Sequence, residues 1–231
     1  MELARLIHDF FNWHVMVETL PMLARGLVVT VEIAALSLVI GIALGLVLAV
    51  ARVAITRKSV PLLVRGLNLP IAFYVDSIRA IPPLVTLVAV YFALPYLGVF
   101  LPRFWSAVAT FVLVLAAFAE EIFRAGIESI DRGQTEAARA HGLTYLQTMR
   151  YVIVPQALRV AIPPLTSRMI SITKDVSLAS VIGVSDLLKQ ARAQQALTAN
   201  PTPLISAAIM FTLLFLPLVR LSMYVERKLK Q

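Results

Sequence analysis

The stretch from Leu27 to Ala51 reads LVVTVEIAALSLVIGIALGLVLAVA, and Glu32 is its only ionisable residue. A helix needs roughly 20 mostly apolar residues to cross about 30 Å of hydrocarbon, so this stretch is long enough to span a membrane. Gly41 and Gly45 lie within it at the GxxxG spacing that lets two helices approach closely. The stretch therefore predicts a transmembrane helix with a face suited to close packing.

The composition of the whole chain agrees with this prediction. Of the 231 residues, 59% are hydrophobic and 15% are charged. A soluble domain carries about 45–50% apolar and about 25% charged residues. The formal net charge is +8, but the basic residues lie between apolar runs, as they do beside membrane spans, rather than along one polar face that would bind nucleic acid. The chain has no cysteine, which excludes disulfides, thiolate catalysis and cysteine-ligated metals.

Further apolar stretches predict an all-α membrane protein with about five transmembrane helices. Prolines and charges at membrane depth are tolerated only where they face protein or a water-filled cavity. The interrupted spans therefore favour a polar pathway; the alternative is proline kinks packed by neighbouring helices. The four stretches that follow the first are 67–91, which contains Asp76, Arg79 and Pro82-Pro83; 104–119, which is short; 157–188, which contains Pro163-Pro164 and Lys174-Asp175; and 204–224.

The distribution of basic residues predicts the orientation. Cytoplasmic loops carry an excess of Lys and Arg, and with five spans the two termini lie on opposite sides. The N-terminus is therefore predicted outside and the C-terminus in the cytoplasm. The basic residues assigned to the cytoplasmic side are Arg52, Arg57, Lys58, Arg65, Arg124, Arg132, Arg139, Arg150, Arg227, Lys228 and Lys230; the opposite side carries Arg103, Lys189 and Arg192 in its loops and Arg5 and Arg25 in the N-terminal segment.

Residues 1–25 are predicted to form an external segment. Apolar residues at helical spacing within Leu3–Trp13 favour an interfacial helix on the outer surface, and a loosely ordered arm is the alternative. No basic n-region precedes a compact apolar run, so no cleavable signal peptide is predicted. The predicted transmembrane domain covers residues 26–228, and residues 229–231 form a cytoplasmic tail.

A long loop after the third span, about 124–155, predicts two short helices joined at a sharp corner. Asp131 and Gln134 form a capping-box variant for a helix over roughly 134–141, which ends at Gly142. Thr144 and Gln147 form a second capping box, and the helix that they start is kinked or ended by Pro155. This arrangement is a plausible docking plug for a partner protein.

The same loop resembles the EAA motif of ABC importer permeases. The motif residues are Glu136-Ala137-Ala138, then Gly142, then Val152-Ile153-Val154-Pro155, with Val at both apolar positions where Ile and Leu are usual. The resemblance extends over roughly residues 26–228 to the polar amino acid branch of the type I importers, a histidine/glutamine permease-like family; Val114-Leu115, Ala80, Ile81 and Val176 depart from it. The matching segments are Arg79-Ala-Ile-Pro82, Glu121-Ile-Phe-Arg-Ala-Gly-Ile127, Gly133-Gln134, Gln156-Ala-Leu-Arg159, Pro163-Pro164 and Lys174-Asp-Val-Ser-Leu-Ala-Ser-Val-Ile-Gly183.

This resemblance implies a type I importer permease fold in a bacterial inner membrane. It also implies that Glu136, Ala137, Ala138 and Gly142 contact a cytoplasmic ATPase through a coupling helix. The implied partners are a dimer of that ATPase, which binds ATP and Mg, a second permease that is identical or homologous, and an external or periplasmic amino-acid-binding protein. No nucleic-acid partner is expected.

The predicted substrate pathway includes Arg79, Lys174, Asp175 and Ser177. Charges inside a bilayer cost a few kcal/mol, so Lys174 and Asp175 need partners. In one interpretation Lys174 binds the carboxylate of an amino acid and Asp175 binds its ammonium group. In the other, both residues pair with side chains of neighbouring spans and hold the helix bundle together. Arg79 lies one helical turn after Asp76 and could pair with it.

Three functions remain after the motif search. The chain has no G-x-x-x-x-G-K-[ST] phosphate loop, no H-E-x-x-H and no G-x-S-x-G, so it is predicted not to be an enzyme and to need another subunit for ATP hydrolysis. An importer permease is the leading hypothesis. The alternatives are an ion-gradient-driven secondary transporter, which broken helices favour but which would need an inverted repeat that we do not find, and a membrane scaffold.

Overall fold

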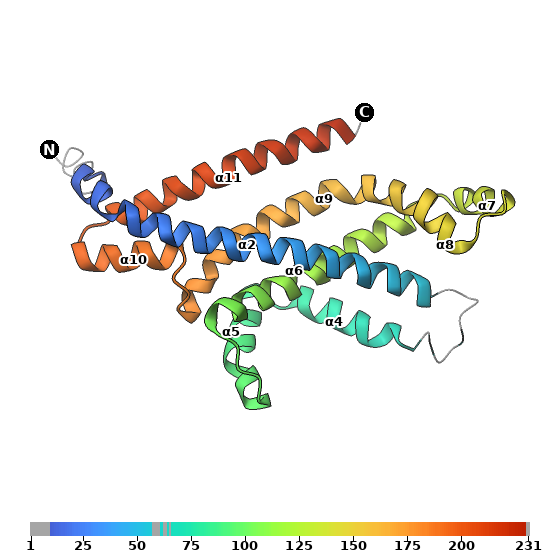
Figure 1. Cartoon of the computed structure of the whole chain (residues 1–231), viewed down its shortest axis with the longest axis horizontal. Helices are drawn as coiled ribbons and strands as arrows, with labels where there is room; N and C mark the ends of the chain where they lie inside the picture. Colours follow the sequence, from blue (N-terminus) through green and yellow to red (C-terminus); the bar gives the residue numbers. More distant parts are fainter. Residues whose placement is uncertain (1–9, 57–60, 62–63, 65, 230–231) are drawn as a thin grey trace. The chain divides into compact units, whose positions relative to one another are not determined.

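The computed structural model describes every residue except 1–9, 57–60, 62–63, 65 and 230–231. The described residues form helices and connecting loops without a β-strand (Figure 1). In chain order the helices are α2 (Trp13–Ile55), α4 (Asn68–Ala80), α5 (Pro83–Ala93), η1 (Leu94–Leu97), α6 (Arg103–Glu128), α7 (Arg132–Ala140), α8 (Tyr145–Thr148), η2 (Met149–Ile153), α9 (Val154–Asp175), η3 (Val176–Ile182), α10 (Leu187–Thr198) and α11 (Thr202–Leu229).

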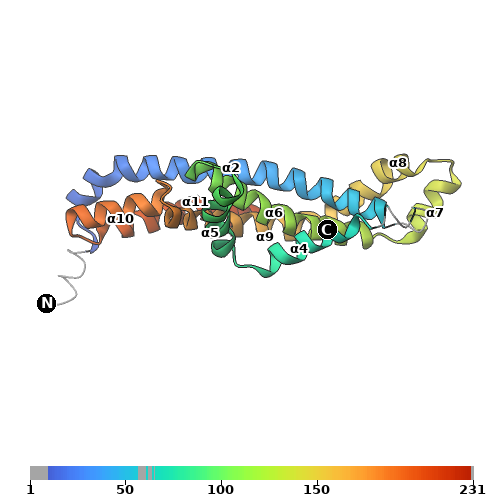
Figure 2. The same cartoon turned by 90° about the horizontal axis from the view of Figure 1, so that it is seen from below.

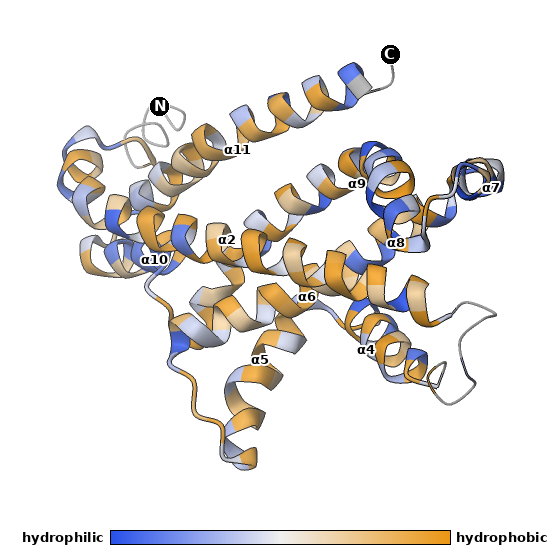
Figure 3. Cartoon of the chain, turned by 45° about the vertical axis from the view of Figure 1, so that its right-hand side comes forward, coloured by the Kyte–Doolittle hydropathy of each residue, from blue (hydrophilic) through white to orange (hydrophobic). Residues whose placement is uncertain are grey.

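Three of the described helices, α2, α6 and α11, are long and apolar enough to cross a membrane, and the broken pair α4–α5 would make a fourth span. The predicted fourth span, 157–188, is not one helix: its first part lies in the 22-residue α9, which ends at Asp175, and its second part forms η3 and the start of α10. α9 falls outside the group of apolar helices because basic residues and prolines dilute its apolar ones. Figure 3 shows hydrophobic residues along α5 and α11 and hydrophilic ones on the short α7. The all-helical membrane architecture expected from the sequence is therefore present.

Two predicted spans are longer in the structure than expected. The first occupies α2, a 43-residue helix that begins at Trp13, so residues 13–25 of the predicted external segment belong to it. Residues 1–9, which hold most of the predicted interfacial helix, lie outside the described residues. The third span was predicted over 104–119. Its predicted end was wrong for the helix, since α6 continues to Glu128. Its last turns carry acidic and basic side chains that pair with one another and so remain helical.

Prolines act differently in the two interrupted spans. Ile81, between α4 and α5, is extended at φ −90° and ψ 133°, because the residue before a proline disfavours the helical region. The next helix then starts at Pro83, a position where the missing N–H costs nothing. In α9, by contrast, Pro163 and Pro164 lie inside a continuous helix, so the interruption predicted at these prolines was wrong. The interruption predicted at Lys174-Asp175 is present, since α9 ends at Asp175 and the 3₁₀-helix η3 follows.

The chain folds into two compact units. Unit one contains residues 1–37, 83–111 and 170–221. Its apolar core joins α2, α10 and α11 through Leu23, Leu187, Ala191 and Ala207, and α10 lies alongside the first part of α2 in two views (Figures 1 and 2). The Oγ1 of Thr30 accepts a hydrogen bond from the Leu187 N–H at 3.1 Å, which fixes the start of α10 against α2.

Unit two contains residues 38–82, 112–169 and 222–231. Its core packs α2, α6 and α9 through Ala49, Ala119, Phe123, Ala161 and Leu165. A Cβ atom added at Gly45 would lie only 2.5 Å from the Ala119 Cβ, and one added at Gly41 would lie 2.9 Å from the Leu115 Cβ. The close helix approach expected from the GxxxG spacing is therefore present between α2 and α6.

Candidate functional site

The loop between α6 and α9 is built by local hydrogen bonds. Asp131 caps α7, and its Oδ1 accepts from the Gly133 N–H at 2.7 Å. The predicted box with Gln134 does not form, because the Gln134 Oε1 instead accepts from Gln156 Nε2 at 3.4 Å. α7 covers Arg132–Ala140 rather than 134–141. Asp131 was thus correctly predicted as the N-cap of α7, while the prediction that Gln134 completes its capping box was wrong.

The corner after α7 has the glycine geometry that the sequence predicts. Gly142 has φ +82°, in the left-handed region, where a Cβ would be strained. Its N–H donates to the Arg139 carbonyl at 3.0 Å, and the Leu143 N–H donates to the Ala138 carbonyl at 3.2 Å. These bonds satisfy carbonyls at the end of α7 and reverse the chain, as in other helix C-caps.

The second short helix begins at the predicted capping box. The Thr144 N–H donates to the Gln147 Oε1 at 2.8 Å, and the Gln147 N–H donates to the Thr144 Oγ1 at 3.4 Å. After one turn the helix widens into the π-helix η2. There the Val154 N–H donates to the Met149 carbonyl, five residues back. Pro155 does not end the helix, because α9 runs through it.

The predicted ATPase-contact residues divide into two groups. Glu136, Ala137 and Gly142 are exposed, whereas Ala138 is 7% exposed and packs into the unit. Two large apolar side chains on the same loop, Leu146 at 77% and Tyr151 at 64%, are exposed and were not selected from the sequence. Their exposure follows from the orientation of the helices after Gly142, which a linear pattern does not reveal. α7 and α8 lie side by side in both views (Figures 1 and 2).

A cavity of about 490 Å³ lies where this loop meets the ends of α2 and α6. Its lining includes Glu128, Arg132 and Tyr145 beside several apolar residues. The cavity brings residues of α6 together with residues of α7 and α8, so a side chain bound there would contact both. The other lining residues are Val53, Ile127, Ile130, Thr135, Thr148, Met149 and Ile153.

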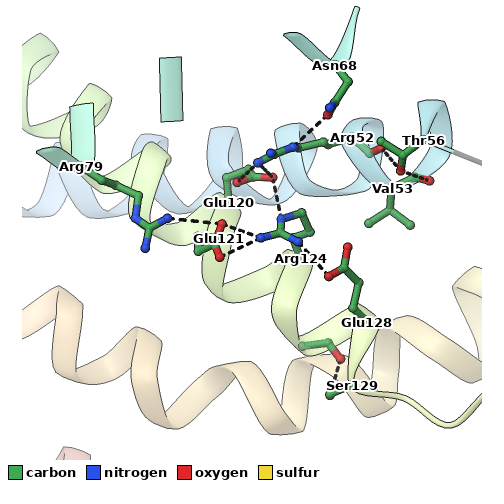
Figure 4. A network of polar contacts seen from close by, with 11 residues as sticks. Arg52, Val53, Thr56, Asn68, Arg79, Glu120, Glu121, Arg124, Glu128 and Ser129 are labelled. Atoms are coloured by element: carbon green, nitrogen blue, oxygen red, sulfur yellow. Dashed lines mark hydrogen bonds and ion pairs between the residues drawn. The ribbon is translucent and has the colours of Figure 1, made fainter. Parts of the chain in front are cut away.

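A network of ion pairs in unit two was not predicted. Glu120 is fully buried, and both of its carboxylate oxygens accept from Arg52 Nη1, at 3.3 and 3.2 Å (Figure 4). Arg52 also donates through Nε to the Asn68 Oδ1 at 2.9 Å, so one side chain of α2 joins α4 and α6. A possible signal in the sequence is the acidic pair Glu120-Glu121 with Arg124 one turn later, at the end of an apolar run.

The same network contains Arg79, which the sequence assigned to the substrate pathway. Arg79 Nη1 lies 3.4 Å from Glu121 Oε2, and its guanidinium lies 5.7 Å from the centre of the Phe118 ring. The expected pairing of Arg79 with Asp76 was wrong, because Glu121 on α6 provides a carboxylate across the helix interface. Arg79 thus joins α4 to α6 in this arrangement.

The other predicted pathway residues lie in unit one, at the junction of α9 and η3. Lys174 is exposed, and its Nζ lies 5.9 Å from the centre of the Phe215 ring. Asp175 is half-buried and ends α9, and the Ser177 Oγ donates to the Lys174 carbonyl at 2.8 Å. η3 then ends at Gly183, whose φ of +84° closes the segment. Lys174, Asp175 and Ser177 therefore lie within one turn of each other.

Comparisons with known proteins identify the family. Residues 63–231 match the family described as binding-protein-dependent transport system inner membrane component. The arginine transport system permease protein ArtQ of Bacillus subtilis (strain 168) is 36% identical over 91% of this chain and 94% of its own length. The probable glutamine ABC transporter permease protein GlnP of the same organism is 38% identical over 76% and 77%.

Solved structures agree with this result. A chain of a structure described as an amino acid ABC transporter with histidines has a TM-score of 0.82 and 33% identity, covering 95% of this chain and 98% of that one. The inward-facing MetNI methionine ABC transporter shares the fold, with a TM-score of 0.75 and 21% identity over 92% and 98%. The chain belongs to the binding-protein-dependent transport system inner membrane component family.

Proposed function

We propose that this chain is the permease subunit of an ATP-binding-cassette importer and that it carries polar amino acids across a bacterial inner membrane. The observation that supports this most strongly is the loop Asp131–Pro155, where a capped helix, a left-handed glycine and a second capping box present Glu136 and Ala137 at the surface. By their names, the relatives given above are an arginine transport system permease protein and a probable glutamine ABC transporter permease protein.

The partners follow from this role. Two copies of a cytoplasmic ATPase would bind ATP and Mg and dock on α7, while an external binding protein would deliver substrate. A second permease, identical or homologous, would complete the pathway. ATP binding would favour one of two orientations of the membrane subunits, which is the requirement for alternating access.

Docking can be tested with two glycines of matching geometry. Gly142 has φ +82° and Gly98 has φ +80°, and in neither case would an added Cβ meet an atom within 4 Å. The backbone strain of Gly142→Asp and Gly98→Asp is therefore comparable, but only Gly142 lies in the proposed docking loop. Each tagged variant, purified with its associated subunits in mild detergent, is assayed for ATP hydrolysis.

We expect ATPase activity to co-purify with the wild type and with Gly98→Asp, and to be lost from Gly142→Asp. If no ATPase accompanies a folded wild-type chain, the importer function is refuted. Equal retention of ATPase by both variants would instead refute the docking role of the loop.

The proposed pathway residues require a transport assay. Lys174, Asp175 and Ser177 would meet a zwitterionic amino acid, with Lys174 receiving its carboxylate and Asp175 its ammonium group, because opposite charges are attracted most strongly where water is scarce. Uptake of labelled arginine, glutamine and cystine by vesicles that contain the complex would identify the substrate. Arginine and cystine are included because they are named for relatives of this chain.

The proposed orientation places the N-terminus outside and the C-terminus in the cytoplasm. The chain contains no cysteine, so a single cysteine introduced at His141 or Gly98 can be labelled without background. An impermeant maleimide added to intact cells should label Gly98→Cys and spare His141→Cys. The reverse pattern would invert the orientation and would place α7 outside.

A further inference from the structure

The ion-pair network of unit two is balanced in charge and has two distinct ends. It contains three arginines, Arg52 on α2, Arg79 on α4 and Arg124 on α6, and three glutamates, Glu120, Glu121 and Glu128, all on α6 (Figure 4). One end is Arg79, in the last turn of α4 just before the break at Ile81. The other end is Glu128, which ends α6 and lines the cavity beside α7.

Arg124 lies at the centre of this network and holds two carboxylates. Its Nη2 donates to both Glu121 oxygens at 2.7 Å, and its Nη1 donates to the Glu128 Oε2 at 2.8 Å. Both distances are typical of strong, charge-assisted hydrogen bonds. Glu121 also lies 3.4 Å from Arg79. A continuous line of contacts therefore runs from the broken span through Arg124 to the base of the loop.

One donor of Arg124 is left without a hydrogen bond. Its Nε is buried and has no hydrogen-bond partner among the residues that the structure describes, and the Glu120 Oε1 lies 3.8 Å away. A buried donor without an acceptor is unfavourable, and closing this gap to hydrogen-bond distance requires a shift of only roughly 0.7 Å. Glu120 is available for such a shift, because its bonds to Arg52, at 3.2 and 3.3 Å, are long for charged partners.

Arg124 thus has two carboxylates within reach of different donors, one exposed at the surface and one buried. The Glu128 side chain is 57% exposed, whereas that of Glu120 is 0% exposed. Movement of α7 would displace Glu128 directly, since Glu128 shares the cavity with Arg132 and Thr135 of α7. When Glu128 is withdrawn, Nε can close on Glu120, which loosens the contact of Glu120 with Arg52.

We propose that Arg124 is a positioning residue of the transport cycle, and that it exchanges Glu128 for Glu120 to pass movement of the coupling loop to α2 and α4. This inference rests on the proposed importer function, since it requires an ATPase that moves the loop. Coupling between two sites needs an element with two discrete arrangements that both sites can bias. The unbonded Nε and the two competing glutamates provide that element.

A purely structural role for the network predicts different behaviour. A static lock would affect assembly and stability, and uptake would change only in proportion to the amount of assembled complex. The exchange predicts a change in the ratio of substrate imported to ATP hydrolysed while assembly is intact. Glu128→Gln is the informative variant, because an exposed ion pair contributes little to stability.

The test uses the complete complex of permease, ATPase and binding protein in lipid vesicles. ATP hydrolysis and uptake of whichever of arginine, glutamine or cystine the wild type imports are measured on the same preparation. Glu18→Gln is the matched control, because Glu18 is also an exposed glutamate, 65% by its side chain, in an i,i+4 pair with His14 at 3.7 Å. Arg124→Lys is the second variant, since lysine keeps the charge but cannot bridge two carboxylates through a planar fork.

We expect Glu128→Gln and Arg124→Lys to lower uptake per ATP between about twofold and thirtyfold, the usual range for residues that carry coupling, with normal assembly for Glu128→Gln. Glu128→Asp should recover part of the ratio, and Glu18→Gln should match the wild type. An unchanged ratio in Glu128→Gln, or its failure to assemble, would overturn the exchange and leave a static lock. A wild-type complex without ATPase would refute the proposed function itself, and with it this inference.

Discussion

At Gly45 the helices α2 and α6 approach closely, and replacing this residue with alanine should destabilise unit two. An added Cβ would lie 2.5 Å from the Ala119 Cβ, 2.9 Å from the Ala116 carbonyl oxygen and 3.0 Å from the Glu120 nitrogen. Two of these three atoms belong to the α6 backbone, which cannot rotate away as a side chain can. The helices would therefore have to separate by on the order of 1 Å.

The magnitude follows from two opposing effects. Alanine favours the helix over glycine by roughly 0.5–1 kcal/mol, whereas an extra methyl group forced into a well-packed core costs typically about 1–3 kcal/mol. The second effect should prevail, because Ala119 is fully buried and the separation also disturbs the Arg52–Glu120 pair at 3.2 Å. We expect a net loss of about 1–2 kcal/mol, which corresponds to a lowering of Tm by roughly 2–8 °C at this chain length.

The measurement is thermal unfolding of the detergent-purified permease, followed by circular dichroism. Val47→Ala is a suitable control, since Val47 lies two residues away on α2 and is 64% exposed. Its substitution should change stability by less than about 0.5 kcal/mol. If Gly45→Ala unfolds at or above the Tm of the wild type, α2 and α6 do not approach as closely as described, and the packing argument fails.

Two further substitutions test the ion pairs and the pathway. Arg52→Met should cost about 3–5 kcal/mol of unfolding free energy, because it leaves the fully buried Glu120 carboxylate without its main partner; the double variant with Glu120→Gln should unfold at a higher temperature than Arg52→Met alone, and equal temperatures would contradict the pairing. Asp175→Asn should raise the KM for amino acid uptake while the complex still assembles, and loss of detergent-stable assembly would instead show that Asp175 locks the bundle.

The features that could be predicted from the sequence are those formed within a few residues. The Thr144–Gln147 box and the left-handed Gly142 each depend on atoms at most five residues apart, so the residue types are sufficient to specify them. The GxxxG spacing also predicted close packing correctly, since the small residues themselves permit the approach. The identity of the partner helix, α6, was not contained in that spacing.

The features that were missed depend on contacts between distant parts of the chain. Arg52 and Glu120 are 68 residues apart in sequence, so no local pattern shows that a buried carboxylate just beyond the predicted end of the span has an arginine partner on α2. Gln134 binds Gln156 rather than completing the box with Asp131, because the fold brings α9 beside α7. Sequence patterns pair each polar residue with one that is close to it in sequence, whereas in the folded chain polar residues also pair across helix interfaces.

The π-helix η2 shows how the loop and α9 are joined despite a proline. Pro155 has no N–H and its ring would collide with the carbonyl four residues back in an α-helix, that of Tyr151. The wider π turn over Met149–Ile153 avoids this collision, since the preceding Val154 N–H already donates five residues back to Met149. The helix is therefore continuous from Tyr145 into α9 with one residue more than an α-helix would need. A partner docked on α8, as proposed above, would therefore displace the start of α9 without a break in the helix.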